Sequence, residues 1–251
     1  MSCIFENTLH YSSPGHGDWG VVRIGMLAPE SIQLFVCPSA CGRHGAIGAM
    51  KQGLKERLFY LYVSQSDIID GYDGLIPGAV GEVLEAVSPR PKVFFLFVSC
   101  LDDLIGTDHD ALLEELGRLH PDIQFRVCHM NPISLSSKTP PPVSIQNNLY
   151  SLLRPEKIHD SGINAVGNLE ITAPSSELYG FLNAHGAASS AIFPCTTPWT
   201  DTRRWQKAGI TWCLARRDGR QPPRWKSGSG SRICSFRSPM IWKRLPQGTK
   251  P

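Results

Sequence analysis

Residues 92–130 constrain the fold more than any other part of the chain. The segment starts with an apolar run over residues 93–98, which suits a strand buried on both faces. Leucines then recur at helical spacing over residues 112–119, and Pro121 ends that pattern. The next strand is predicted over residues 123–127. The order strand, helix, strand predicts one unit of a parallel α/β sheet.

The same order of elements recurs on both sides of this unit. A strand is predicted over residues 32–36, a helix over 45–57 and a second strand over 58–63. A further short helix is predicted over residues 79–87, and a strand over residues 163–166 leads into one more helix. We therefore expect an α/β fold, a Rossmann-like parallel sheet flanked by helices.

Two local signals refine this prediction. Thr107 is the expected N-cap of the leucine-rich helix, and Asp108 and Asp110 favour the positive end of the helix dipole. Residues 137–143 read SKTPPPV and are predicted to form a surface turn, because consecutive prolines join neither a strand ladder nor a helix.

Residues 191–251 have a different composition. They hold 13 of the 25 lysines and arginines but only two of the 22 acidic residues, together with five of the six tryptophans. A disordered basic tail that binds nucleic acid is one interpretation. Disordered tails are poor in tryptophan and cysteine, so we prefer a second interpretation, in which the segment is translated out of frame. Shifting the frame by one base can turn residues 231–242 into a strand and loop.

The sequence shows neither a membrane-spanning segment nor a signal peptide, and we therefore expect a cytoplasmic protein. The sequence has no run of about 18 uncharged apolar residues, and its first ten residues lack the basic and then apolar layout of a signal peptide. We expect no membrane partner and no nucleic-acid partner. Eight cysteines in a cytoplasmic chain of this size indicate metal binding, redox chemistry or simple burial rather than disulfides.

Three cysteines follow predicted strands. Cys37 and Cys41 come directly after the strand over residues 32–36, and Cys100 comes after the strand over residues 93–98. Functional residues of open α/β sheets collect at the carboxyl ends of strands, so these thiols converge if the two strands are neighbours. Iron–sulfur clusters are held by such thiolates. A zinc site with His44 as fourth ligand, or plain packing of the cysteines, remains an alternative.

The sequence around these cysteines resembles the nitrogenase component 1 superfamily. CPSACGRHGAIGA is similar to the cysteine loop of that family, and SCLDDLIGTDHDAL is similar to its Cys-Pro-x-x-Leu-Ile-Gly-Asp-Asp segment. The later GINAVGNLEITAPSSELYGFLNAHG resembles the start of the family's second Rossmann-like domain. The matching positions are Pro38, Cys41, Gly42, Cys100, Leu104, Ile105, Gly106 and Asp108.

The resemblance implies an oxidoreductase subunit that forms the first domain of a multi-domain fold. Cys37, Cys41 and Cys100 are then the metal ligands of an iron–sulfur cluster, either 4Fe-4S or P-cluster-like. The implied partners are a homologous component 1 subunit, in a homo- or hetero-oligomer, and an ATP-dependent iron–sulfur reductase. A scaffold for metal-cofactor assembly is the alternative function. The substrate and any catalytic residue stay open.

The resemblance also implies an order of domains along the chain. Residues 1–30 form an N-terminal segment, and residues 31–160 form the Rossmann-like cluster-binding domain. Residues 161–190 start a second Rossmann-like domain, and residues 191–251 form the irregular basic tail. Catalytic family members carry three such domains, so the chain is expected to be a truncated homologue, and an inactive one is a further alternative.

One cluster ligand of the family is missing from the sequence. Family members carry a further cysteine in a glycine-rich stretch that aligns here with SSPGHGDWGVVRIG, which contains none. Cys37 is the favoured substitute because it is tethered at the same strand end as Cys41. Cys3, Asp18 or a residue of the partner subunit are the alternatives.

The remaining polar candidates have simpler interpretations. His109 and His120 are expected on the helix surface, and Asp102 and Asp103 resemble an acid/base couple although helix dipoles alone favour acids there. Packing or exposure is a better explanation than proton relay for three histidines, which are His10, His16 and His44. The other cysteines are expected to be core or incidental residues, namely Cys128, Cys195, Cys213 and Cys234.

Overall fold

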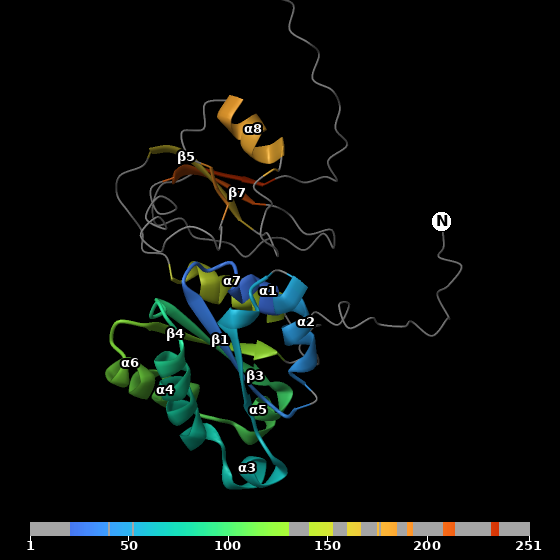
Figure 1. Cartoon of the computed structure of the whole chain (residues 1–251). Coiled ribbons are helices and arrows are strands. Elements are labelled where there is room, and N and C mark those ends of the chain that lie inside the picture. Colours follow the sequence, from blue (N-terminus) through green and yellow to red (C-terminus); the bar gives the residue numbers. More distant parts are fainter. Residues whose placement is uncertain are drawn as a thin grey trace, which may run out of the picture.

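The computed structural model describes residues 21–39, 41–51, 53–130, 141–152, 160–166, 175, 177–184, 190–192, 208–213 and 232–235. Residues 31–130 contain a four-stranded sheet in which every neighbouring pair is parallel (Figure 1). The strand order is β2-β1-β3-β4. The strands are β1 (Ser31–Cys37), β2 (Leu58–Tyr62), β3 (Val93–Ser99) and β4 (Gln124–Met130).

Helices cover both faces of this sheet, as Figure 1 shows. One face is covered by α1 (Val21–Gly25), α2 (Arg43–Lys51) and α7 (Pro141–Tyr150). The other face is covered by α4 (Ile76–Ala86) and α6 (His109–Leu119). The connections include α3 (Gln65–Asp70), α5 (Cys100–Ile105) and the 3-10 turns η1 (Lys55–Arg57) and η2 (Asp73–Leu75). The predicted α/β sheet with flanking helices is confirmed.

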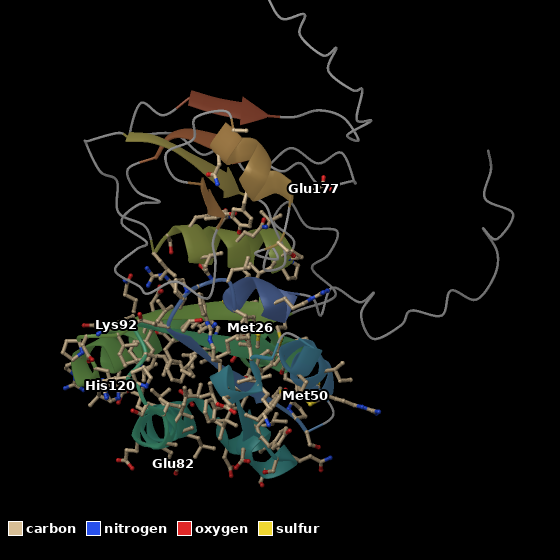
Figure 2. The ribbon with its side chains drawn as sticks, turned by 45° about the horizontal axis from the view of Figure 1, so that its top comes forward. Met26, Met50, Glu82, Lys92, His120 and Glu177 are labelled. Atoms are coloured by element: carbon tan, nitrogen blue, oxygen red, sulfur yellow. The ribbon has the colours of Figure 1, made fainter. Side chains whose placement is uncertain are left out.

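The two central strands are buried along their whole length. Alternate residues of β1 and β3 point to opposite faces, so each strand supplies both layers of the core. Phe35 and Phe97 face α1 and α2 and stack with ring centroids 4.8 Å apart. Figure 2 shows Met26 enclosed by neighbouring side chains, whereas Met50 and Glu82 lie on the outside. Burial on both faces explains why these strands read as continuous apolar runs.

The helix predicted over residues 45–57 is shorter in the structure. It ends at Lys51, and the 3-10 turn η1 follows. Gly53 has a φ of +68°, and the Leu54 amide donates a hydrogen bond back to the Ala49 carbonyl. A left-handed glycine of this kind ends a helix by satisfying its last carbonyls.

Two further details of the helix predictions were wrong. The N-cap of α6 is Asp108 and not Thr107, since the Asp108 carboxylate accepts a 3.0 Å hydrogen bond from the Ala111 amide. The prolines predicted to form a turn instead begin α7, with Pro141 and Pro142 buried in its first turn. Proline is tolerated there because the first amides of a helix have no partner within it. Residues 137–140 lie outside the described residues.

The half-buried Arg57 binds the backbone of the segment that leads into β1. The Arg57 guanidinium donates hydrogen bonds to the carbonyls of Ser31 at 2.7 Å, Ala28 at 2.6 Å and Met26 at 3.3 Å. Hydrogen bonds from a charged donor are stronger than neutral ones. The side chain therefore fixes the turn between α1 and β1 against the edge strand β2.

We predict that Arg57→Met lowers the free energy of unfolding by about 2 kcal/mol, because three carbonyls lose a charged donor. Urea denaturation followed by circular dichroism measures this change. The exposed neighbour Lys55 provides the control, and Lys55→Met should change the free energy of unfolding by less than about 0.5 kcal/mol. Equal effects of the two substitutions would contradict the assigned role of Arg57.

A second parallel sheet lies in the C-terminal half of the sequence. Its strand order is β6-β5-β7-β8, and the helix α8 (Glu177–Ala184) connects β5 to β6 along the chain. The strands are β5 (Asp160–Val166), β6 (Ser190–Ile192), β7 (Ala208–Cys213) and β8 (Arg232–Ser235). The strands β7 and β8 and the end of β6 lie within residues 191–251, the segment that was expected to be irregular. The rest of residues 193–251 lies outside the described residues.

No helix in the described part of the chain is both long and apolar enough to cross a membrane.

Candidate metal centre

Three cysteines lie at the carboxyl edge of the first sheet. The strands β1 and β3 are direct neighbours, with Val36 opposite Val98. Cys37 is the last residue of β1, and Cys100 is the first residue of α5 immediately beyond β3. The condition set by the sequence, that the two strands lie side by side, is met.

Electrostatic coupling connects the three thiols. Burial, followed by the nearby Cys41, raises the pKa of Cys37 to about 12. Burial, followed by the nearby Cys100, raises the pKa of Cys41. Because charge interactions weaken with distance, Cys41 lies close to both other cysteines. Cys37 and Cys41 are therefore protonated at neutral pH, and a bound metal ion would have to displace their protons.

The loop that carries Cys41 is fixed by an aromatic residue of the edge strand. The Cys41 amide donates a 2.9 Å hydrogen bond to the Pro38 carbonyl, which closes a tight turn. The Tyr60 hydroxyl donates a 2.6 Å hydrogen bond to the Gly42 carbonyl. A Cβ atom on Gly42 would overlap the Tyr60 ring. Glycine at this position lets the loop pack directly on β2 and places Cys41 at the sheet edge.

We predict that Gly42→Ala lowers the free energy of unfolding by about 1–3 kcal/mol, because the added methyl group overlaps the Tyr60 ring. Urea denaturation measures the effect. Gly81 in α4 has open space around its Cβ position, so Gly81→Ala is a matched control that should raise stability by about 0.5–1 kcal/mol. The assigned packing is wrong if Gly42→Ala is as stable as the natural sequence.

The three cysteines differ in exposure. Cys37 is fully buried within the apolar core that contains Phe35 and Phe97. Cys41 and Cys100 are partly exposed at the sheet edge. A metal centre held by all three would therefore have one side against the apolar core and the other toward the surface of this unit.

A second polar group lies beside Cys100. Asp102 is 1% exposed, and its Oδ1 accepts a 2.7 Å hydrogen bond from the Tyr72 hydroxyl. His109 Nε2 lies 2.6 Å from Asp102 Oδ2. Burial, followed by the hydrogen bond to Asp102, raises the pKa of Tyr72. The expectation that His109 is a surface residue is wrong, because its side chain packs against a buried carboxylate and is 19% exposed.

His129 completes this group and was missed from the sequence. Its Nδ1 lies 2.8 Å from Asp103 Oδ1, and its ring meets the His109 ring edge-on with centroids 4.8 Å apart. The predicted strand ended at residue 127, whereas β4 extends to Met130 and places His129 opposite Val98. A histidine two residues past a predicted strand was the signal available in the sequence.

The other sequence candidates fall into two groups. Cys128 is fully buried, as expected for a core residue, and the Asn148 side chain donates a 2.6 Å hydrogen bond to the adjacent Val127 carbonyl. His120 is partly exposed and lies near the exposed pair of Arg90 and Asp122. Outside the described residues are Cys3, His10, His16, Asp18 and Cys195, and the side chains of His44, Cys213 and Cys234 are likewise not described.

Comparison with solved structures identifies the fold. No protein-family model and no curated protein sequence matches the chain. A structure of nitrogenase Cp1 at pH 6.5 superposes with a TM-score of 0.58 over 78% of this chain, at 12% sequence identity. A structure of nitrogenase Cp1 at pH 5 gives a TM-score of 0.59 over 80% of this chain, at 16% identity. The chain has the fold of nitrogenase Cp1.

The chain corresponds to only part of a nitrogenase Cp1 polypeptide. It covers 47% and 42% of the two Cp1 chains, respectively. At 12% and 16% identity the likeness concerns the fold, and it does not transfer a ligand or an activity. The resemblance in fold that the sequence motifs implied is confirmed.

Proposed function

We propose that the protein is a nitrogenase component 1-like oxidoreductase subunit that holds an iron–sulfur cluster through Cys37, Cys41 and Cys100. It would act in the cytoplasm, relaying electrons from an ATP-dependent iron–sulfur reductase to a substrate. The observation that carries this proposal is that Cys37 ends β1, Cys41 lies in the loop that follows, and Cys100 lies just beyond the neighbouring parallel strand β3. The Cp1-like fold supports it.

The donor set fits an iron–sulfur cluster better than a hard metal ion. Three thiols from two strand ends share one edge, and thiolates are the usual ligands of iron–sulfur clusters. Gly42 lets the backbone of the loop lie close to β2, which leaves Cys41 at the edge. When bound, such a cluster would accept and release single electrons.

The residues around the thiols would control the environment of that centre. The stacked rings of Phe35 and Phe97 form an apolar wall on the side of Cys37 and exclude water from it. Tyr60 fixes the Cys41 loop through its hydrogen bond to Gly42. A low local dielectric and a fixed ligand loop are the means by which proteins tune cluster potentials.

Exposed apolar side chains at the same edge support a partner subunit. Ile69 of α3 is 83% exposed and Leu104 of α5 is 81% exposed, while Tyr62 at the end of β2 is 55% exposed. Large exposed apolar groups that cluster on one side of a protein often mark an interface. We propose that a homologous component 1 subunit covers this edge, where it would also supply a cluster ligand if Cys37 does not serve.

Anaerobic reconstitution with iron and sulfide tests the proposed function. The full chain should become brown, gain visible absorbance, and show an EPR signal in its reduced or oxidised form. Bound iron, sulfide and zinc are measured on the same sample. A colourless protein that carries one equivalent of zinc and no sulfide would contradict the proposal.

A further inference from the structure

Two carboxylates and two imidazoles gather at the carboxyl ends of β3 and β4. We name Asp102, Asp103, His109 and His129 the Asp–His cluster. One ligand atom from each of Asp102, Asp103 and His129 lies within 4.8 Å of the others. We propose that the Asp–His cluster binds a divalent first-row transition-metal ion, at a site distinct from the three thiols.

A buried acceptor without a hydrogen bond points to a missing cation. Asp102 is 1% exposed, and its Oδ2 makes no hydrogen bond to any described residue. The Nε2 atom of His109 is buried as well and equally lacks one. The two atoms are 2.6 Å apart, but they do not form a hydrogen bond. Hydrogen bonds weaken steeply when donor, hydrogen and acceptor are not aligned, so a short distance alone is not sufficient.

Such an arrangement is costly without a ligand. A carboxylate oxygen that loses water on burial requires a hydrogen-bond donor or a cation to compensate. Here Asp102 Oδ2 and His109 Nε2 are both buried, lie 2.6 Å apart and make no hydrogen bond within the described residues. A shared metal ion satisfies both atoms at once, whereas a shared proton would need the alignment that is missing.

The donor atoms define the class of metal. Carboxylate oxygens and imidazole nitrogens together suit Mn²⁺, Fe²⁺ and Zn²⁺. Opposite ligands of such an ion are about 4 Å apart, so a small inward rotation of Asp103 and His129 closes the site. Their mutual 2.8 Å contact would then be replaced by bonds to the ion.

Neighbouring contacts hold the ligands in place. Tyr72 donates to Asp102 Oδ1 and leaves Oδ2 to face His109. His109 and His129 orient each other through their edge-on ring contact. Outer contacts of this kind fix the direction of metal ligands. The ligands come from α5, α6 and β4, so three elements of the rigid sheet unit define the site.

Mn²⁺ is the best probe because thiolates are poor ligands for it, so the three cysteines do not compete. The full chain is titrated with Mn²⁺, and free Mn²⁺ is measured by EPR. We expect about one bound equivalent. Asp103→Asn and His129→Gln should each weaken binding at least tenfold, and Zn²⁺ should displace the bound Mn²⁺. Both side chains are partly exposed, at 31% and 39%, so the variants are expected to fold.

Matched controls come from the amino edge of the same sheet. Asp122→Asn and His120→Gln replace the same residue types away from the Asp–His cluster and should leave Mn²⁺ affinity unchanged. Cys41→Ala should also leave it unchanged, which separates this site from the proposed iron–sulfur centre. Circular dichroism verifies the fold of each variant. The proposal is overturned if the natural sequence shows no saturable binding, or if the cluster variants bind Mn²⁺ as well as the controls do.

Discussion

Cys41→Ala is expected to abolish the iron–sulfur EPR signal of the reconstituted protein, and Cys100→Ala is expected to do the same. Each substitution removes a thiolate from one of the two strand ends that face a common centre. Two of the three thiols would then remain in either variant, too few to hold a cluster that three protein thiolates bind. The measurement is EPR after anaerobic reconstitution, with bound iron and sulfide counted per chain.

Cys128→Ala provides the control for this series. Cys128 is as buried as Cys37 but lies on β4 with Asn148 beside it, so its loss should preserve the signal. Cys37→Ala distinguishes the ligand sets: loss of the signal makes Cys37 a ligand, and retention points to Cys3, Asp18 or a partner residue. Retention of full signal in both Cys41→Ala and Cys100→Ala would contradict the proposed centre.

Phe97→Ala is expected to give the largest loss of stability, about 3–5 kcal/mol in the free energy of unfolding. Phe97 is fully buried on the central strand β3, and its ring stacks on Phe35 at 4.8 Å. Removing it leaves a cavity between the sheet and the helices that cover this face. Urea denaturation of the protein without metal measures the change.

Phe59→Ala is the matched comparison for this prediction. Phe59 lies on the edge strand β2 and is only partly buried, so its loss should cost clearly less stability than that of Phe97. The proposed core would be wrong if the two alanine variants were equally stable, or if Phe97→Ala lowered the free energy of unfolding by less than about 1 kcal/mol.

The sequence predicts the central strands well because burial on both faces leaves a continuous apolar run. Both β1 and β3 lie where such runs were recognised, and neither depends on distant contacts for its identity. The prolines of α7 misled the prediction because their effect depends on position: they break a helix in its interior but begin one in its first turn. Sequence alone did not indicate that a helix starts there.

The candidate site was predictable only in part. Placing Cys37, Cys41 and Cys100 at strand ends required nothing beyond the order of elements. The contact of Asp103 with His129 depends on the parallel register of β3 and β4, and the contact of Asp102 with His109 depends on how α5 and α6 pack after β3. These contacts depend on tertiary structure. From the sequence alone, Asp102 therefore looked like an ordinary acidic residue in the first turn of a helix.

The second sheet illustrates the same limit. Its strands β7 and β8 are six and four residues long, and they pair in parallel with their neighbours. β7 reads AGITWC and β8 reads RICS, and neither shows a clear alternation of apolar and polar residues. Only the pairing partner distinguishes such a segment from irregular chain.

X-ray absorption at the iron edge of the reconstituted full chain is the most direct test of whether cysteine thiolates from two strand ends coordinate one iron–sulfur cluster. We predict a first shell dominated by sulfur with iron scatterers beyond it, and loss of both features in Cys41→Ala. A first shell of oxygen and nitrogen alone, unchanged in Cys41→Ala, would contradict this account.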